Sequence, residues 1–453
     1  MRNSWPVLLL LLSTFIYALI LPPFEVADEP AHFAKAAQLA SWAFPSVRVG
    51  SDWGAMIPLP LVKMIREWRP IPPGSLTTQR PLGRLCNGLL APPADGGTVG
   101  FASFTYVGSY PSFFYFSQAV GLRLGALLGL APLGQFYAGR LVGGLFAVSL
   151  ILLGIRLIPF GKRTATLIAC LPGVAGQLGT YSADSTIIAI TFFASCLLVR
   201  GSSNPSSKLR WIQSGLVPLI ILAKGVYLPI VFAGMGVREA WKPRHLIRMT
   251  IPIAFGLALF VFWFGILARH AVVVQSFVSH YTLLHVTAAT PRQQMGFMEA
   301  HPFAALRAIL VTIIERLPVY AIECIGRFGP FIVTLPIPVY ILGALSVAGA
   351  TVATRPGEPM PEAGQRILWL AIVLAVVILV HIALYMVAST LGESHVEGVQ
   401  GRYFIPVLPL LGLTVRTRAS AAAGRFLDIT LPVCFFILTC SAATMIAISF
   451  WSW

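Results

Sequence analysis

The sequence predicts an all-α protein that crosses a membrane about eleven times. Of its 453 residues, 57% are hydrophobic and only 11% are charged, and the mean hydropathy is +0.81. Soluble domains carry about 25% charged residues. The apolar stretches approach the roughly 20 residues that a helix needs to cross a bilayer. We therefore expect one polytopic membrane domain over residues 1–453, with no soluble terminal domain.

The first apolar stretch, 5–21, is expected to remain in the membrane as a helix. Arg2 precedes it, as in a signal peptide, but Pro22, Pro23 and Glu25 follow where small residues would mark a cleavage site. We therefore expect a retained helix whose N-terminus lies in the cytoplasm.

Short basic segments punctuate the apolar stretches and set the expected orientation. Cytoplasmic loops of membrane proteins carry an excess of Lys and Arg, which also attract anionic lipid headgroups. The net charge of +16 is explained in this way without nucleic acid, since the basic residues do not gather in one patch. We place five basic segments on the cytoplasmic side: 161–163, 200–210, 238–248, 355–366 and 416–425.

This sidedness constrains the number of crossings. Residues 112–130 contain Gln118 and Arg123 and are rich in Phe and Tyr, so we expect an amphipathic helix on the outer surface. Residues 306–325 carry four charged side chains and are treated in the same way. With eleven crossings, all five basic segments lie on the cytoplasmic side, and thirteen crossings are the alternative. The eleven expected spans are 5–21, 134–159, 164–181, 184–200, 211–223, 225–238, 249–269, 331–353, 367–389, 403–416 and 427–450.

Two large segments are then expected outside the membrane. The first, 22–133, is a long loop with surface helices, and the second is 270–330. Smaller outer turns lie near 181–184 and 390–402. A functional site would have to be built from these outer segments and from the ends of the helices.

A pair of carboxylates, Asp28 and Glu29, follows the first span directly. His32 lies one helical turn after Asp28. Charged groups at a membrane are costly unless they are solvated, paired or used, and carboxylates suit general-base work or a divalent cation. Asp28 is the strongest single candidate for such a role, and it also fits as the N-cap of a helix that Pro30 begins, which is compatible with a role in a site. Both interpretations stay open at this point.

Cationic side chains are expected on the same outer face, where they suit a phosphate or diphosphate group. Lys224 stands alone between apolar stretches, so it must either snorkel to water or meet an anion. Arg402 stands where the chain re-enters the membrane, where we favour contact with a phosphate or sugar over the alternative of an interfacial anchor beside Tyr403. Arg327 lies between glycines that also fit a tight turn, and Arg140 lies in a predicted span.

A second acid, Asp184, lies between two predicted spans, where it fits either a site residue or a helix cap. Glu393, His395 and Glu397 alternate at a spacing of two, which is a weak pattern for a metal site. The residues expected to line a substrate groove are Tyr110, Tyr181, Tyr227, Glu393, His395, Glu397, Gln400 and Tyr403.

Taken together, these features resemble the GT-C glycosyltransferases, polytopic enzymes that use sugars linked to polyprenyl phosphate. The resemblance rests on the acidic pair after the first span, the long first outer loop and the second Asp on the next outer turn. More narrowly, the chain resembles a bacterial family catalogued as a domain of unknown function. The motifs that carry this narrower resemblance, which extends from about residue 5 to about residue 415, are Asp28–Phe33, Tyr110-Pro111, Lys224–Pro229 and Gly401–Pro406.

The resemblance implies a GT-C-like fold and sugar transfer at the periplasmic face of the bacterial cytoplasmic (inner) membrane. The donor would be a polyprenyl-phosphate or diphosphate sugar, the acceptor a hydroxyl group on a glycan or lipid, and the outcome inversion. Asp28 would be the general base, supported by Glu29, His32 and Asp184. No cofactor is required, although Asp28, Glu29 and Asp184 are the residues that would hold Mg²⁺ or Mn²⁺.

The donor phosphate is expected to bind a set of cationic residues: Lys224, Arg402, Arg327 and Arg140. The alternatives from other functional classes are a transporter or flippase for lipid-linked glycans and a non-catalytic scaffold of a polysaccharide assembly system. A transporter would show repeats and broken helices with polar groups at the midplane of the membrane. In this sequence the polar residues concentrate at one face instead.

Overall fold

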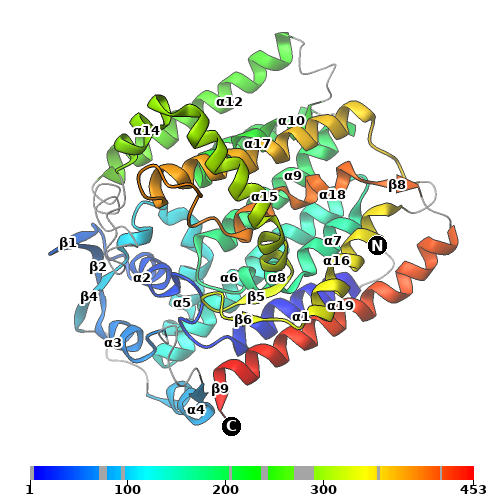
Figure 1. Ribbon diagram of the computed structural model, residues 1–453. Helices are drawn as coiled ribbons and strands as arrows, with labels where there is room; N and C mark the ends of the chain where they lie inside the picture. The colour runs from blue at the N-terminus through cyan, green and yellow to red at the C-terminus, as the bar shows by residue number, and fades with distance from the viewer. Residues whose placement is uncertain are drawn as a thin grey trace.

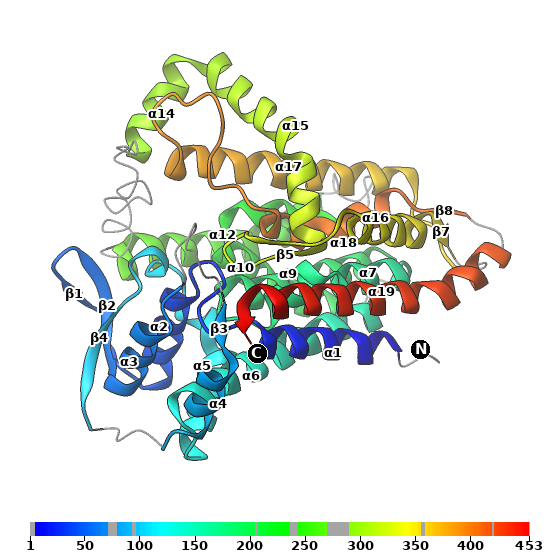
Figure 2. The same ribbon diagram turned by 60° about the horizontal axis from the view of Figure 1, so that its bottom comes forward.

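The protein consists mainly of nearly parallel helices, with smaller helices and a short sheet gathered at one end (Figures 1 and 2). The structure is a computed structural model. It describes residues 5–70, 79–92, 97–203, 207–235, 243–269, 290–354, 358–418 and 421–452. Parts of the basic segments 200–210, 238–248, 355–366 and 416–425, and of the outer segment 270–330, lie outside these residues.

Five helices among the described residues are long and apolar enough to cross a membrane. They are α6 (Pro132–Leu157), α9 (Ala183–Ser203), α12 (Pro243–Phe262) continued by η4 (Trp263–Leu267), α17 (Ala363–Ala388) and α19 (Ala421–Phe450). Shorter apolar helices are α1 (Trp5–Ile20), α10 (Ser207–Ala223), η3 (Gly225–Gly234) and α16 (Ile337–Val352). A mostly helical chain with several apolar helices is therefore confirmed, whereas eleven or thirteen crossings and the GT-C fold stay predictions.

Two of the predicted spans are not single helices. The stretch 164–181 is divided into α7 (Lys162–Cys170) and α8 (Pro172–Leu178). Proline lacks an N–H group and pushes the preceding residue out of the helical region, and Leu171 is indeed extended, with φ −55° and ψ 133°. The stretch 403–416 is likewise divided into the 3-10 helix η6 (Gly401–Val407) and α18 (Leu408–Thr414).

Residues from four of the five expected cytoplasmic segments, all except 238–248, lie together at one end of the parallel helices. Strand β7 (Ala353–Thr354) pairs with β8 (Thr417–Arg418). Arg416 contacts Glu358 at 2.9 Å and Arg163 contacts Asp428 at 2.6 Å. Arg200 donates to the carbonyl oxygen of Leu157 at 3.0 Å. Folding thus brings these separate basic segments to one end, as the charge pattern predicts.

The opposite end carries the first loop (Figure 1). Strand β9 (Trp451–Ser452), after the last helix, pairs with β3 (Arg80–Pro81) in this loop. The loop also contains α2 (Glu29–Ala40), α3 (Leu59–Glu67) and α4 (Leu82–Leu90). A three-stranded antiparallel sheet of β1 (Val47–Val49), β2 (Asp52–Pro58) and β4 (Val99–Ser103) stands beside α2. The loop therefore contains a small sheet as well as helices.

Helix α5 (Phe116–Leu127) follows the short 3-10 helix η2 (Ser112–Tyr115) and packs along α6. Its 12 residues span about 18 Å, which is less than the roughly 30 Å of a bilayer core. Two glycines allow this close packing. A Cβ atom on Gly121 would lie 2.5 Å from the carbonyl oxygen of Ala138, and one on Gly125 would lie 2.9 Å from Cα of Gln135.

Gly121→Leu is expected to destabilise the protein by about 1–3 kcal/mol, because a side chain at this contact must push α5 away from α6. Thermal unfolding in detergent would measure the effect. Gly215→Leu in α10 is the matched control, since a Cβ atom there meets nothing within 4 Å. Equal unfolding temperatures for the two variants would contradict the close packing of α5 on α6.

Two helices, α14 (Pro291–Ala300) and α15 (Pro302–Gly326), follow the undescribed part of the second outer segment. With 25 residues, α15 is about 37 Å long, so its length is sufficient for a crossing. Figure 2 shows α15 inclined steeply to α1, α17 and α19. The interfacial placement of this segment stays a prediction.

Candidate functional site

Four charged residues from separate elements meet at the first-loop end of the helices. Asp28 immediately precedes α2, Asp184 lies in the first turn of α9, Lys224 precedes η3, and Arg402 lies in η6. Lys224 Nζ lies 2.6 Å from Asp184 Oδ1. Arg402 Nε lies 3.4 Å from Asp184 Oδ2, and Arg402 Nη2 lies 3.6 Å from Asp28 Oδ2. We call these four residues the charge network.

Burial differs among the members of the charge network. The side chains of Arg402, Asp184 and Lys224 are 8%, 9% and 17% exposed, whereas that of Asp28 is 32% exposed. Ion pairs are strengthened where water is excluded. The network therefore contains a buried acid held between two cations, and a second acid that is open to an incoming group.

The conformation of Asp28 distinguishes the two interpretations of this residue. It occupies the N-cap position of α2, but its side chain makes no capping hydrogen bond. Its φ of 62° is left-handed, a conformation that Asp tolerates better than most residues. Such outliers occur often at functional sites. The capping interpretation is therefore wrong for the side chain, which contacts Arg402 instead.

Glu29 turns away from Asp28 and pairs with Arg140. Its carboxylate accepts from Arg140 Nη2 at 2.6 Å and Nε at 2.9 Å, and both side chains are fully buried. The same carboxylate accepts from the backbone N–H groups of Phe24 and Tyr181. The remaining N–H groups of Arg140 bind carbonyl oxygens at the end of α1, those of Ala18, Leu21 and Pro22.

This closed arrangement corrects the expected roles of Glu29 and Arg140. Arg140 has no N–H group left for a phosphate, and Glu29 has no open oxygen for a substrate proton. The expected metal set of Asp28, Glu29 and Asp184 is also divided, because Glu29 faces Arg140. No group of three His, Cys, Asp or Glu side chains suited to a metal occurs within the described part of the chain.

His32 lies beside the charge network and belongs to its buried wall. Its Nδ1 lies 2.7 Å from the hydroxyl of Tyr115, and its ring packs 6.0 Å from that of Tyr110. Burial lowers the pKa of His32 to about 4, although the carboxylates of Asp28 and Asp184 act in the opposite direction. His32 is therefore neutral at pH 7.

The lowered pKa of His32 predicts a loss of stability in acid. Because the unfolded chain takes up this proton near pH 6.5 and the folded protein only near pH 4, stability falls as the pH drops between these values. The expected slope is about 1.4 kcal/mol per pH unit. Unfolding temperatures in detergent should vary less with pH in His32→Gln than in the unchanged protein. The exposed His301 supplies the control, His301→Gln; an unaltered pH dependence in His32→Gln would count against the prediction.

Three of the predicted groove tyrosines surround Lys224. Its Nζ lies 4.4 Å from the ring centre of Tyr403 and 5.7 Å from that of Tyr110. Tyr227 donates to the carbonyl oxygen of Tyr403 at 3.0 Å. Burial raises the pKa of Tyr110 to about 12, so its hydroxyl stays protonated. Tyr181, by contrast, is buried behind the site and donates to the carbonyl oxygen of Phe136.

The segment 393–400 folds mainly onto its own residues and onto neighbouring helices. Glu393 accepts from the hydroxyl of Thr390, and His395 Nε2 lies 3.0 Å from Glu315 in α15. Glu397 donates its backbone N–H group to Ser389, while the Oε1 atom of Gln400 is buried without a hydrogen-bond partner among the described residues. The structure does not bring Glu393, His395 and Glu397 together with the charge network.

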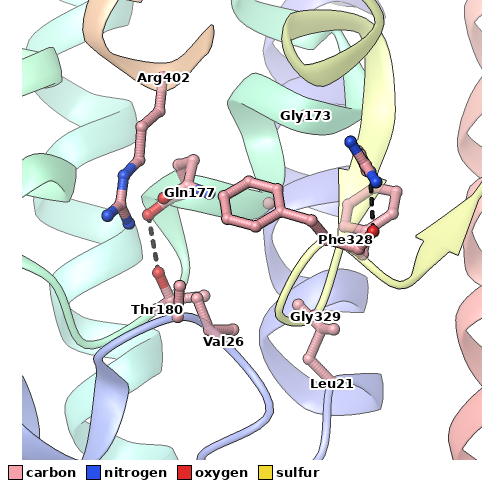
Figure 3. Close-up of a pocket in the computed structure, with 12 residues that line it drawn as sticks. Leu21, Val26, Gly173, Gln177, Thr180, Phe328, Gly329 and Arg402 are labelled. Carbon is pink, nitrogen blue, oxygen red and sulfur yellow. Dashed lines mark hydrogen bonds between the residues drawn. The ribbon is translucent and has the colours of Figure 1, made fainter. Parts of the chain in front are cut away.

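Arg327 lies at a cavity that the sequence did not indicate. It begins β5 (Arg327–Phe328), which pairs with β6 (Val333–Thr334). The cavity is small, with only about 20 Å³ of space for the centre of a water molecule, and both Arg327 and Arg402 line it. Figure 3 shows Arg402 at one side, with Gln177 between it and Phe328.

Glu323 is a further residue that the sequence did not single out as part of the site. Its Oε2 accepts from the backbone N–H group of Gly401 at 2.5 Å, and its Oε1 lies 3.7 Å from Arg327. A Cβ atom on Gly401 would lie 2.6 Å from the carbonyl oxygen of Tyr320, so this close approach requires glycine. Glu323 thereby fixes the segment that carries Arg402 relative to Arg327.

Comparison with known proteins places the site within a family. A family model described as "Predicted membrane protein (DUF2142)" matches residues 11–411. The match includes all four residues of the charge network as well as Arg327. No curated protein and no solved structure matches the chain.

Proposed function

Because the chain belongs to the DUF2142 family of predicted membrane proteins, its function has to be inferred from the site, and we propose that it is a membrane glycosyltransferase. The proposed donor is a sugar on a polyprenyl-phosphate carrier, and the proposed acceptor is a hydroxyl group of a glycan or lipid. The proposed location is the periplasmic face of a bacterial inner membrane, with the N-terminus in the cytoplasm.

One observation carries this proposal: the charge network combines an open carboxylate with buried cations at the same end of the helices. Asp28 is the most exposed member, and Arg402 contacts it at 3.6 Å. Transfer from a sugar phosphate needs a base for the acceptor and positive charge for the departing phosphate. Asp28 supplies the first requirement, and Arg402 supplies the second next to it.

The proposed reaction has one displacement step. Asp28 takes the proton of the acceptor hydroxyl as the oxygen attacks the anomeric carbon of the donor. The bond from this carbon to the phosphate oxygen breaks, and polyprenyl phosphate leaves with the electron pair. Attack from the face opposite the phosphate inverts the anomeric centre. Arg402 stabilises the phosphate, so the step requires no cofactor.

Asp184 takes a positioning role in this proposal, in place of the catalytic role that the sequence suggested. It contacts Lys224 at 2.6 Å and Arg402 at 3.4 Å. A buried acid held by two cations is a poor base, since both cations stabilise its charged form. Its carboxylate instead holds Arg402 within reach of Asp28.

A reconstituted transfer assay tests the proposal. Purified protein in liposomes would receive a tritium-labelled hexose on polyprenyl phosphate, together with a glycolipid extract of the source membrane. Release of polyprenyl phosphate with label in the acceptor fraction is expected. Movement of the intact labelled lipid between leaflets without cleavage would favour the flippase instead. If the labelled lipid is neither cleaved nor moved between leaflets, the non-catalytic scaffold becomes the better explanation.

A further inference from the structure

Lys35 is a buried cation outside the charge network. It lies in α2, about two helical turns after Asp28, and is only 4% exposed. It forms no ion pair within the described part of the chain. Burial lowers the pKa of Lys35 to about 7, because the ammonium group loses its hydration. The cost of burying such a group has to be offset by what the group binds.

The amino group of Lys35 binds the backbone of one short segment. Its Nζ donates to the carbonyl oxygen of Gly108 at 2.5 Å and to that of Val107 at 3.4 Å. It also lies 5.4 Å from the ring centre of Phe104. Val107 ends the 3-10 helix η1 (Thr105–Val107), and both carbonyl-bearing residues are buried. Buried carbonyl groups at the end of a helix need donors from elsewhere in the protein, and Lys35 is such a donor.

The segment that Lys35 holds leads directly to Tyr110, which faces the charge network. The ring centre of Tyr110 lies 5.7 Å from Nζ of Lys224 and 6.0 Å from the ring centre of His32. The backbone N–H group of Tyr110 donates to the carbonyl oxygen of Val107 at 3.1 Å, so Tyr110 is tied to a carbonyl group that Lys35 contacts. Tyr110 is only partly buried, and its raised pKa keeps the hydroxyl protonated. It can therefore contact an incoming hydroxyl group.

A second side chain holds the same segment from the membrane helices. Trp263 begins η4, and its Nε1 donates to the carbonyl oxygen of Ser109 at 2.8 Å. The carbonyl groups of Val107, Gly108 and Ser109 are thus bound in succession by side chains of α2 and η4. Because two separate elements bind three consecutive carbonyl groups, the backbone before Tyr110 has little freedom to move.

From these contacts we infer that Lys35 is a positioning residue for the acceptor: it fixes the segment Val107–Tyr110 so that Tyr110 stays beside Lys224. The kinetic consequence rests on the proposed function and deepens it. In that reaction the acceptor hydroxyl lies at Asp28, and Tyr110 forms a neighbouring wall that orients the acceptor. Lys35 acts through Tyr110 and does not touch the reacting atoms.

Fluorine NMR tests the position of Tyr110 without any assay of transfer. Fluorotyrosine is introduced at position 110, and spectra are recorded in nanodiscs at about pH 6, where Lys35 carries its charge. Lys35→Met is expected to shift and broaden the resonance, because the segment before Tyr110 loses its charged donor. Lys63→Met, at an exposed position on α3 of the same loop, is the matched control and should leave the resonance unchanged.

Two further variants keep this test decisive if Lys35→Met does not fold. Lys35→Gln retains N–H donors but is shorter and uncharged, so it should move the resonance in the same direction by a smaller amount. Trp263→Phe keeps an aromatic ring and loses only the N–H group that binds Ser109, so it should also move the resonance. An unchanged resonance in both Lys35 variants, or in Lys35→Gln alone if only that variant folds, overturns the inference.

The transfer assay tests the consequence for the acceptor. Lys35→Met is expected to raise KM for the acceptor about 10-fold, because one charge-assisted contact behind the acceptor wall is lost. The value of kcat should stay nearly the same, since Asp28 and Arg402 keep their places. A purely structural role would instead lower the amount of active protein, which reduces kcat at an unchanged KM. That result would overturn the positioning role.

The two measurements can fail separately. A resonance that depends on Lys35, in a protein that transfers no sugar, would retain the control of Tyr110 by Lys35 and reject the proposed reaction. Sugar transfer with an unchanged KM for the acceptor in Lys35→Met and Lys35→Gln would retain the reaction and reject Lys35 as a positioning residue.

Discussion

Asp28→Asn is expected to lower the rate of sugar transfer by about 10²–10⁴-fold without unfolding the protein, which is the range for the loss of a general base. The amide has nearly the same shape as the carboxylate but cannot take the acceptor proton. Since Asp28 is 32% exposed and its only ion pair among the described residues is the 3.6 Å contact with Arg402, its replacement removes little packing or charge pairing. The effect should therefore appear in kcat, with thermal unfolding nearly unchanged.

A matched variant separates this effect from a general loss of charge on the loop. Asp52 lies in β2 of the same loop and outside the charge network, so Asp52→Asn should transfer sugar at the normal rate. Asp28→Glu should retain part of the activity, because it keeps a carboxylate at a changed distance. Full activity of Asp28→Asn, with normal amounts of folded protein in the liposomes, would remove Asp28 from the role of base.

Asp184 should behave differently from Asp28 in the same assays. Asp184→Asn leaves Lys224 and Arg402 without their shared buried partner, and removing one member of a buried ion pair is strongly destabilising. A lower unfolding temperature together with reduced transfer would fit a positioning role. If Asp184→Asn instead kept the unfolding temperature of the unchanged protein but lost all sugar transfer, Asp184 would be the better candidate for the base.

The convergence of the charge network was predictable from the sequence because a membrane limits where polar groups can lie. Asp28, Asp184, Lys224 and Arg402 each stand at the end of an apolar stretch, and the charge pattern assigned these ends to one side. Helices that run nearly parallel then bring the ends of one side together. The number of crossings depends on segments such as 306–325, whose composition suits either a crossing or an interfacial helix. This number in turn decides whether that side faces outward or into the cytoplasm.

The partners of individual side chains were less predictable. Asp28 and Glu29 are adjacent in sequence, yet their side chains contact different residues, because Asp28 has a left-handed backbone and Glu29 begins the helix. Nothing in the sequence linked Glu29 to Arg140, which lies 111 positions later. The cavity at Arg327 was not predictable for a similar reason: its lining residues Leu21, Gln177 and Phe328 come from three separate segments with no shared motif.

The buried pair of Glu29 and Arg140 predicts the largest effect on stability. Glu29→Ala is expected to cost about 3–5 kcal/mol of unfolding free energy, because it leaves Arg140 charged and fully buried. The loss should spread beyond the pair itself, since the Glu29 carboxylate also accepts from Phe24 and Tyr181, and Arg140 holds three carbonyl oxygens at the end of α1. Denaturant titration in detergent would measure the effect.

Replacing both members separates the cost of an unpaired charge from the value of the pair. Glu29→Leu combined with Arg140→Met removes both charges, so it should be less destabilising than the sum of the single changes. The folded fraction of the double variant should still transfer sugar, because neither side chain contacts the charge network. If the double variant were stable and inactive, Glu29 or Arg140 would act in the reaction, and the division between the structural pair and the site at Asp28 would be wrong.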